Sequence, residues 1–281
     1  MKIVYLKWNV LSTIILLSAC QKTELLQNLS MNNNASKLAA NAKNTSATTA
    51  VGNSSPTPTV YPKTTIATVA TIPVYKLSNY NCVLYKAGFA VDADGSPNAY
   101  GPNNSGLDYT ANAGSTGNWW GVVTDNSGNP IIQTATDPSP GMYVSTTSLV
   151  NSSYVTTNPL RYVNSETVPY FVIPTAVRNT GSITIGDIAF VYNKNNKKGC
   201  YAIYADSGPA GSLGEGSIYL ATQLGLNASP KNGGTSTKII EYIIFPGTGF
   251  GQGTIPTLTK INNIGAANMK KLGGVELTKT L

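Results

Sequence analysis

The sequence has no histidine among its 281 residues, and this absence excludes several kinds of catalytic site. Ser-His-Asp and Cys-His schemes need an imidazole as general base, and many zinc sites need one as a ligand. The three cysteines form no Cys-x-x-Cys pair, and no Walker-type phosphate loop is present. The glycine-rich stretch Gly247–Gly253 reads as a loop. Carboxylates are the main proton-transfer groups left, and we expect neither a metal nor a cofactor.

Charged residues are also scarce, at 11% of the chain, where about a quarter is usual. The net charge of +7 does not indicate a nucleic-acid partner, because the central part of the chain is nearly balanced and has no basic stripe interleaved with aromatics. Glycine, Asn, Thr, Ser and Tyr take the place of charge, which favours a strand-and-turn protein facing an extracellular medium. The surplus lysines flank the centre: Lys2, Lys7, Lys22, Lys37, Lys43 and Lys63 before it, and Lys260, Lys270, Lys271 and Lys279 after it.

Long apolar runs are missing too, and the longest near the start, 10–17, is too short to span a bilayer as a stable helix. It follows two lysines and ends in Leu17-Ser18-Ala19-Cys20, which resembles the lipobox of bacterial lipoproteins. Residues 1–20 are therefore predicted to be a lipoprotein signal peptide with Cys20 as the lipidated residue. The protein would then be exported and held at a membrane, periplasmic or at the cell surface. A plain secretory signal with a coincidental cysteine is the alternative.

The rest of the chain divides by composition. Residues 21–70 are rich in Asn, Ala, Ser and Thr, with too few large apolar residues to offset the entropy of ordering, and are predicted to be a flexible linker. Residues 71–253 form the predicted domain, and 254–281 a C-terminal tail with one possible short helix near 266–272. Within the domain, Cys82 and Cys200 either form a disulfide, which export permits, or are two separate buried thiols.

Short runs of β-branched and aromatic residues recur through the domain, separated by Gly, Asn, Asp or Pro. One stretch, 216–224, carries helical spacing and ends at Gly225. The class is thus mainly β with one or two short helices. The predicted strands are 83–91, 119–124, 131–136, 142–147, 170–173, 187–192, 201–205 and 239–245, with a hairpin turn at 193–199.

Two acidic residues, Asp206 and Glu215, lie at positions where a carboxyl group could take part in acid–base catalysis. Asp206 ends an apolar strand, and Gly208-Pro209 turns the chain directly after it, so the carboxylate is presented at a rim. Glu215 lies between Gly214 and Gly216 at the mouth of the predicted helix, where glycines allow close approach of a backbone or a sugar ring. Two such acids can face each other across a groove. The alternative is that both acids are structural: Asp206 caps a turn, and Glu215 interacts favourably with the positive end of the helix dipole.

These motifs resemble the glycoside hydrolase family 75 chitosanases, known mainly from fungi. The family has a Gly-Asp-led strand, a strand ending in Asp-(Thr/Ser)-Gly-Pro, a Gly-Glu-x-Ser element before a helix, a Gly-Gly turn and a Phe-containing strand. The likeness extends from about Ala87 to Gly251 and is looser before Gly186. The matching elements are Gly186-Asp187, Asp206-Ser207-Gly208-Pro209, Gly214-Glu215-Gly216-Ser217, Gly233-Gly234 and Phe245-Pro246-Gly247.

The resemblance implies an inverting mechanism with Asp206 as general base and Glu215 as general acid. An inverting pair needs its carboxyl groups roughly 6.5–9.5 Å apart, with room for a water. The acid must hold a proton near neutral pH, whereas a helix N-terminus lowers a carboxyl pKa. Glu215 must therefore be desolvated or lie close to Asp206 for this assignment to hold.

Further residues are predicted to bind substrate. Asp92 and Asp94 are candidates for the ammonium groups of glucosamine units, although an ordinary Asp-Gly turn would explain Asp94-Gly95 equally well. Trp119 and Trp120 could stack on sugar faces, but neighbouring strand residues point to opposite sides, so we expect at most one to line the groove. Tyr100 is a weaker candidate.

The paired strands also look like the psi-loop element of double-psi β-barrels, so we expect a double-psi-like barrel with a β-rich insertion over 101–159. The predicted function is an endo-glycosidase that hydrolyses β-1,4 linkages in chitosan or a related amino-sugar polysaccharide, acting as a monomer. One alternative is a peptidoglycan-cleaving hydrolase or transglycosylase. The other is a non-catalytic glycan-binding surface lipoprotein.

Overall fold

The computed structural model describes residues 61–275, in which strands make up most of the regular structure. The strands are β1 (Lys63–Val69), β2 (Ile72–Leu77), β3 (Val83–Asp92), β4 (Gly114–Ser115), β5 (Asn118–Trp119), β6 (Tyr170–Pro174), β7 (Ile188–Asn193), β8 (Lys198–Gly208), β9 (Glu215–Ser217) and β10 (Thr235–Phe245). The helices are α2 (Thr175–Thr180), α3 (Ile218–Gln223) and α4 (Leu258–Lys271), with 3-10 turns η1 (Pro102–Asn104), η2 (Thr110–Ala113) and η3 (Pro159–Arg161).

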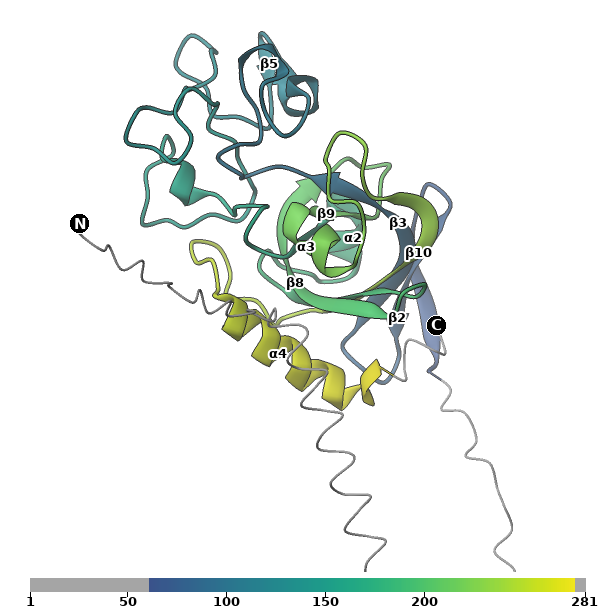
Figure 1. The fold of residues 1–281 in the computed structure, drawn as a ribbon. Helices are drawn as coiled ribbons and strands as arrows, with labels where there is room; N and C mark the ends of the chain where they lie inside the picture. Colours follow the sequence, from purple (N-terminus) through teal and green to yellow (C-terminus); the bar gives the residue numbers. More distant parts are fainter. Residues whose placement is uncertain (1–60, 276–281) are drawn as a thin grey trace, which may run out of the picture. The chain divides into compact units, whose positions relative to one another are not determined.

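Six strands close into a barrel in the order β3, β10, β7, β8, β6 and β9, because β9 pairs with β3 as well as with β6 (Figure 1). The predicted fold class, mainly β with a barrel and short helices, is confirmed. The β3–β9 and β6–β8 pairs are parallel and the other barrel pairs antiparallel, a mixture compatible with the double-psi-like topology. Crossing connections of this kind bring residues distant in sequence to one end of the barrel.

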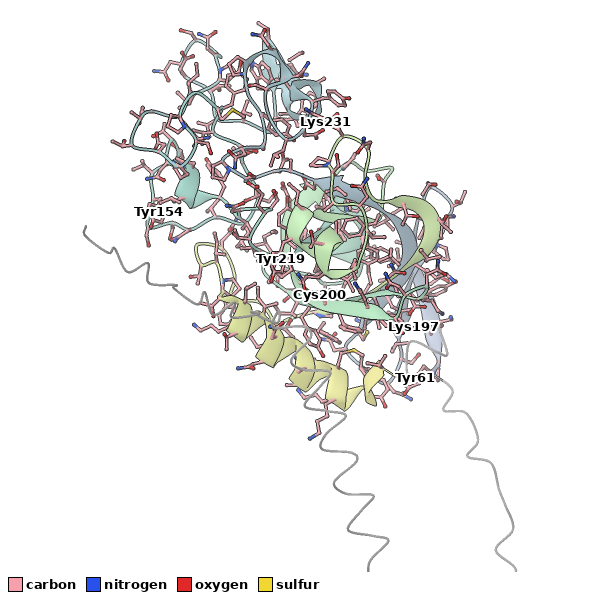
Figure 2. The ribbon with its side chains drawn as sticks, in the orientation of Figure 1. Tyr61, Tyr154, Lys197, Cys200, Tyr219 and Lys231 are labelled. Atoms are coloured by element: carbon pink, nitrogen blue, oxygen red, sulfur yellow. The ribbon has the colours of Figure 1, made fainter. Side chains whose placement is uncertain are left out.

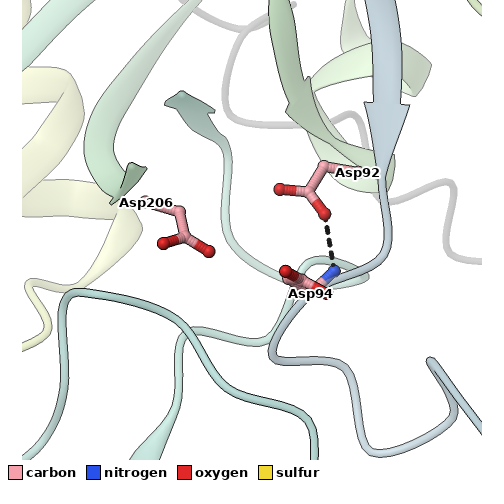
Figure 3. Close-up of side chains that lie close together, drawn as sticks. All are labelled: Asp92, Asp94 and Asp206. Atoms are coloured by element: carbon pink, nitrogen blue, oxygen red, sulfur yellow. Dashed lines mark hydrogen bonds between the residues drawn. The ribbon is translucent and has the colours of Figure 1, made fainter. Parts of the chain in front are cut away.

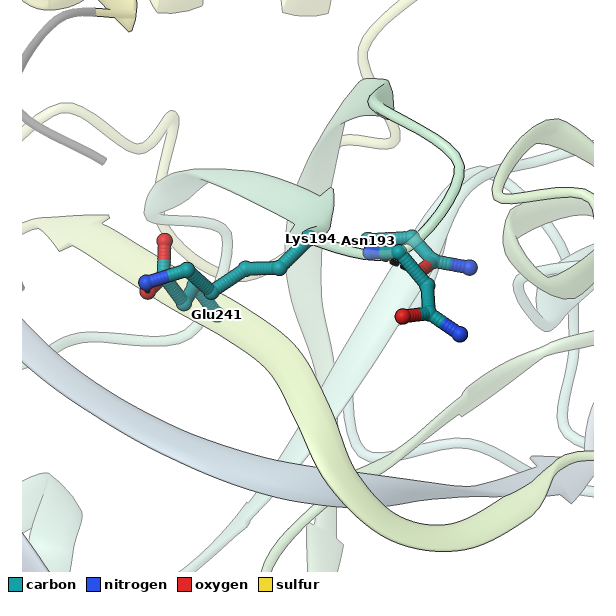
Figure 4. Close-up of polar contacts among 4 residues, drawn as sticks. Asn193, Lys194 and Glu241 are labelled. Atoms are coloured by element: carbon teal, nitrogen blue, oxygen red, sulfur yellow. Dashed lines mark hydrogen bonds and ion pairs between the residues drawn. The ribbon is translucent and has the colours of Figure 1, made fainter. Parts of the chain in front are cut away.

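The barrel strands form from the apolar runs of the sequence, with β6 and β7 buried along their whole length, and facing aromatic rings join neighbouring strands. Tyr85 on β3 lies opposite Tyr242 on β10, and their rings stack with centroids 4.6 Å apart. The β7–β8 hairpin is tied to β10 by an ion pair of 2.8 Å between Lys194 and the buried Glu241 (Figure 4). Burial raises the pKa of Glu241 although Lys194 opposes the rise. Polar and apolar contacts thus both fix the strand register.

A buried carboxylate also fixes the loop after β10. Asp187, directly before β7, accepts hydrogen bonds from the backbone N–H groups of Gly247, Thr248 and Gly249 at 3.1, 2.8 and 2.8 Å. It also accepts from the backbone and hydroxyl of Thr184. The Gly-Asp motif noted in the sequence therefore anchors the glycine-rich loop, and the side chain is fully buried.

The C-terminal segment belongs to the barrel domain, which corrects the predicted boundary at 254. Helix α4 begins at Leu258, well before the expected 266, and packs along β7 and β8 (Figure 1). Its buried face is a narrow stripe at every fourth residue, Ile261, Gly265 and Met269. Gly265 sits against the ring of Tyr201, where a Cβ would lie 2.2 Å from a ring carbon. Such a narrow stripe, with a glycine at its centre, is a weak sequence signal for a helix, which explains why the prediction placed its start too late.

The predicted linker is likewise too long at its end. Residues 63–69 form β1, which pairs with β2 in a hairpin beside β3. The first three residues of β1 are exposed and polar, which is why this strand shares the composition of the segment before it. Tyr61 already contacts the domain, its hydroxyl donating to the carbonyl of Leu272 (Figure 2). The predicted signal segment, Cys20 and the linker up to residue 60 lie outside the described residues. Within 61–275 no helix has the length and hydrophobicity needed to cross a bilayer.

The insertion between β3 and β6 contains less strand than expected. In place of the three predicted strands between 119 and 147, it has the two-residue pair β4–β5 and isolated bridges such as Val122–Ser145 and Ile132–Tyr143. Glycine, proline and aspartate turns interrupt the ladder every few residues, so pairing does not propagate. A small cluster of its own, including Tyr100, Ala113 and Val122, packs the insertion.

The two domain cysteines are both buried, but they are not joined in a disulfide. Burial raises the pKa of the Cys82 thiol to about 12, so it stays protonated. Of the two possibilities left open by the sequence, separate buried thiols is the one found; Cys200 lies on β8 (Figure 2).

Candidate active site

A β-bulge on β8 sets the direction of the Asp206 side chain. Along the parallel β6–β8 pair, Phe171 lies opposite Tyr204, but Val172 lies opposite Asp206, so Ala205 is an extra residue. An uninterrupted ladder would have put Ala205 there instead. Bulges of this kind re-aim a side chain next to a functional site. Because of the extra residue, the side chain of Asp206 points to the same face of the sheet as that of Val172. In a regular strand that face would have been taken by Ala205.

Glu215 lies on β9, not at the mouth of a helix as predicted. Helix α3 begins only at Ile218, where Ser217 is the N-cap and accepts from the N–H of Leu220. The flanking glycine Gly214 has φ +94° and lies so close to β3 that a Cβ there would be 2.5 Å from the carbonyl oxygen of Gly88. The glycine thus allows approach of a backbone, one of the two possibilities that the sequence raised.

Both acids flank the same residue. Val172 on β6 is paired with Asp206 of β8 on one side and with Glu215 of β9 on the other. Residues directly opposite in a ladder point to the same face, and adjacent strands are about 4.8 Å apart. The two Cα atoms are therefore roughly 10 Å apart on one face. The Glu215 carboxylate also reaches toward the end of β8, since its Oε2 lies 3.4 Å from where a Cβ would stand on Gly208.

Glu215 holds its proton more strongly than an ordinary glutamate. Burial, the charge of Asp206 and the charge of Asp108 together raise its pKa from 4.5 to about 7. Glu215 precedes the N-cap of α3 by two residues and lies within a strand, so it is outside the first turn, where a helix dipole acts most strongly. The condition set by the sequence, desolvation or a nearby Asp206, is met on both counts.

Asp206 differs from Glu215 in that its carboxylate accepts several hydrogen bonds. Its Oδ1 accepts from the Ser148 hydroxyl at 2.6 Å, from the Ser148 backbone N–H at 3.0 Å and from the Ser207 N–H at 2.8 Å. Burial raises the pKa of Asp206 above its usual range, and these three donors oppose part of the rise by stabilising the charged form. A proton-holding acid and a hydrogen-bonded carboxylate on one face form a pair suited to acid–base chemistry.

Asp92 and Asp94 complete a cluster with Asp206, as Figure 3 shows. One carboxylate oxygen of each lies within 4.8 Å of the others, so the predicted acidic residues do meet the Asp206 carboxylate. The Asp94 N–H donates to Asp92 Oδ1 at 2.8 Å. The Asp94-Gly95 turn that the sequence offered as an alternative also forms, with the Ser96 N–H donating to the Ala93 carbonyl at 3.1 Å, so the turn and the clustering occur together. Burial and mutual repulsion raise the pKa of Asp92 and of Asp94.

Two tyrosines hold this cluster. The Tyr100 hydroxyl donates to Asp94 Oδ1 at 2.6 Å, and the Tyr170 hydroxyl donates to the Asp94 carbonyl at 3.0 Å. Oxygen ligands this close could also chelate a hard cation, so the expectation of no metal stays a prediction. An ammonium group, like a metal cation, carries the positive charge that these carboxylates attract. It can take the place of the protons that Asp92 and Asp94 hold because their pKa values are raised.

A cavity of about 340 Å³ lies beside the cluster, and Asp206 adjoins it through Asp92 and Asp94. Its acidic lining has one lysine, Lys231, which lies in the loop before β10 and donates to the carbonyl of Gly106 at 2.9 Å (Figure 2). Such a cavity attracts cationic ligands. The charged and aromatic lining residues are Asp92, Asp94, Tyr100, Asp108, Glu215 and Lys231.

Comparison with protein families gives one match, to the family described as fungal chitosanase of glycosyl hydrolase group 75, over residues 90–272. This match spans well over half of the chain. The chain belongs to this family. It is therefore a chitosanase-like glycoside hydrolase, as predicted. The matched region holds the five acids of the site, Asp92, Asp94, Asp108, Asp206 and Glu215, but starts after β1, β2 and most of β3. Among curated proteins, no relative matches the chain.

The two tryptophans predicted to bind substrate, Trp119 and Trp120, are not among the residues that line the cavity. Trp119 is half-buried against Tyr143, with ring centroids 6.2 Å apart, in the small core of the insertion. Trp120 is 62% exposed, and its indole N–H donates to the carbonyl of Asn112. Their side chains do differ in burial as strand neighbours should, but neither reaches the acids, so sugar stacking on them stays a prediction.

Three residues of the chitosanase-like site were not predicted from the sequence. Ser148 contacts Asp206 from 58 positions away, Asp108 raises the pKa of Glu215, and Lys231 closes the cavity. Each lies in a loop whose path depends on tertiary packing, and none belongs to a motif. The one available signal was their location in the long insertion or beside the Gly233-Gly234 turn.

Proposed function

We propose that this protein hydrolyses β-1,4 linkages within chitosan or a related amino-sugar polymer, with inversion, using Asp206 as general base and Glu215 as general acid. The observation that carries the proposal is the pairing of both acids with Val172 on one face, together with the pKa of about 7 for Glu215. Glu215, with a pKa of about 7, can hold a proton near neutral pH, and the donors to Asp206 favour its charged form against the effect of burial.

The spacing of the two acids supports inversion. Their Cα atoms are about two strand spacings apart, roughly 10 Å, which suits the carboxyl separation of about 6.5–9.5 Å that leaves room for a water. Asp206 would take a proton from that water as its oxygen attacks the anomeric carbon. Glu215 would give its proton to the glycosidic oxygen as the bond to that carbon breaks. The proton lost by Glu215 is restored from solvent and that gained by Asp206 released.

The charge of the cavity supports an amino-sugar substrate. Asp92, Asp94 and Asp108 line it, and repulsion among carboxylates raises several of their pKa values. The ammonium groups of glucosamine units would relieve that repulsion, whereas neutral N-acetylated units would not. We therefore propose that glucosamine lies against Asp92 and Asp94, and that acetylated polymers are poorer substrates.

The test is a reducing-sugar assay on chitosan, chitin and peptidoglycan with wild type, Asp206→Asn and Glu215→Gln. We expect turnover on chitosan, a loss of about 1000-fold or more in each variant, and unchanged circular dichroism. Proton NMR of the first product should give the inverted anomer, and a rapid drop in viscosity would mark endo cleavage. Activity near wild type in either variant would remove that residue from the mechanism.

The same assay separates the alternatives. Cleavage of peptidoglycan alone, with anhydro ends detected by mass spectrometry, would replace the proposal with a transglycosylase. Binding of chitosan without any turnover would replace it with a glycan-binding protein.

We further propose export and anchoring through a lipid on Cys20. The support is the short apolar run 10–17 followed by Leu17-Ser18-Ala19-Cys20. Radiolabelled palmitate should enter the wild type in a bacterial host but not Cys20→Ala, and the wild type alone should fractionate with membranes. Label in Cys20→Ala would refute this site. Sedimentation of the 61–281 part of the chain would test the expectation of a monomer.

A further inference from the structure

Hydrogen bonds join the last part of the insertion to β8, the strand that carries Asp206. The N–H of Leu149 donates to the carbonyl of Ala205, the bulged residue, at 2.8 Å. The side-chain amide of Gln252 donates to the carbonyl of Ser148 at 2.6 Å and accepts from the N–H of Val150 at 3.3 Å. The segment at Ser148 is therefore held by backbone pairing with β8 on one side and by the Gln252 side chain on the other, and the Ser148 hydroxyl has a fixed position relative to β8.

All the hydrogen bonds to the Asp206 carboxylate arrive at one oxygen. The hydroxyl and N–H of Ser148 and the N–H of Ser207 all donate to Oδ1, and within residues 61–275 no hydrogen bond is made to Oδ2. Three donors saturate one side of a carboxylate and stop its rotation, because turning it would break all three bonds. The other oxygen keeps its lone pairs available.

We propose that Ser148 is a positioning residue for the general base: its hydroxyl holds Oδ1 of Asp206, so that Oδ2 faces the attacking water and takes its proton. The inference rests on the proposed role of Asp206 and adds a specific part to it. It also gives the insertion a part in the chemistry, since the insertion ends by delivering this hydroxyl to the site.

An exposed serine of the same loop is a matched control. Ser153 lies five residues after Ser148, and its backbone N–H donates to Asn151 Oδ1 at 3.1 Å. Ser153→Ala therefore removes a hydroxyl from this loop without removing a donor to Asp206. Ser148→Thr keeps a hydroxyl at the positioning site, and Ser148→Ala deletes it.

Kinetics on soluble glucosamine oligosaccharides test the proposal. For Ser148→Ala we expect kcat to fall roughly 10-fold or more, with KM little changed, because a charge-assisted hydrogen bond is lost. The acidic limb of the kcat/KM profile should move up by about 1 pH unit, since a stabilising donor to the charged base is missing. Ser148→Thr should restore rate and profile, and Ser153→Ala should match wild type.

A second measurement does not depend on the substrate. The Asp206 carboxyl carbon is followed by NMR against pH in the full chain, assigned through Asp206→Asn, and its titration midpoint should rise in Ser148→Ala. A raised midpoint without any activity on chitosan would leave the positioning role standing while the proposed function fails. An unmoved midpoint, or an unchanged rate and pH profile in active Ser148→Ala, would overturn the role of Ser148.

Discussion

Neutralising Asp108 should move the alkaline limb of activity to lower pH without abolishing turnover. Glu215 acts as an acid while protonated, so activity falls as pH rises through its pKa of about 7. The Asp108 carboxylate is one cause of that raised pKa, and it is 4% exposed, so solvent screens it weakly. Asp108→Asn removes the charge and keeps the shape. The pKa of Glu215 should then fall toward its ordinary value.

The size of the change can be bounded. Burial, Asp206 and Asp108, in decreasing order, raise the pKa of Glu215 from 4.5 to about 7. The least of three influences supplies at most a third of this rise, so the limb should move down by at most about 0.8 pH units. Asp108 accepts from the Tyr109 N–H and the Asn112 amide, and an asparagine can keep both bonds if the Asn112 amide turns over.

The assay is kcat/KM against pH at constant ionic strength, on one defined glucosamine oligosaccharide. Glucosamine amines titrate in the same range, so the informative quantity is the difference between variant and wild type on the same substrate. Asp125→Asn, at an exposed turn of the insertion, makes the same change in net charge and should leave the limb in place. An alkaline limb that stays or rises in Asp108→Asn would refute the link between these two acids.

The other expectations follow from buried charges and from the acidic cavity. Asp187→Ala should lower the free energy of unfolding by about 3 kcal/mol in urea titrations, because several backbone N–H groups lose their buried acceptor. Lys194→Met should cost about 1–3 kcal/mol by leaving the Glu241 carboxylate buried without its ion pair, and Glu241→Gln should cost less, measured the same way. Chitosan oligosaccharides binding to inactive Glu215→Gln should release protons, seen as a buffer-dependent calorimetric heat, because cations lower the raised pKa values of Asp92 and Asp94. High salt should raise KM severalfold with little effect on kcat.

The barrel strands other than β9 were predictable because each contains a local run of β-branched and aromatic residues bounded by turn residues. The runs 83–91, 170–173 and 239–245 lie within observed strands, and the hairpin turn at 193–199 joins β7 to β8 as expected. Asp206 at a strand end followed from the Gly208-Pro209 turn. Elements with weaker patterns were misjudged: β1 begins with exposed polar residues, and α4 buries a stripe only one residue wide.

The finer geometry of the site depends on contacts that sequence spacing does not encode. A three-residue strand is too short to display a period of two, so Glu215 was assigned to a helix start. The bulge at Ala205 is defined by the partner strand β6, and Ser148 meets Asp206 only after the insertion has folded back. The pattern of residue types thus located the acids, and the register between distant strands determines how they face each other.

Because Val172 stands between the two acids, their separation is counted in whole strands and not in loop residues. A retaining enzyme needs carboxyl groups about 5 Å apart, close to a single strand spacing. Point substitutions in the surrounding loops could change which polymer enters while the stereochemical course stays the same. Converting this scaffold from inversion to retention would require a new acid on β6 itself, at the position Val172 now fills, which makes that valine the natural first site for redesigning the outcome of the reaction.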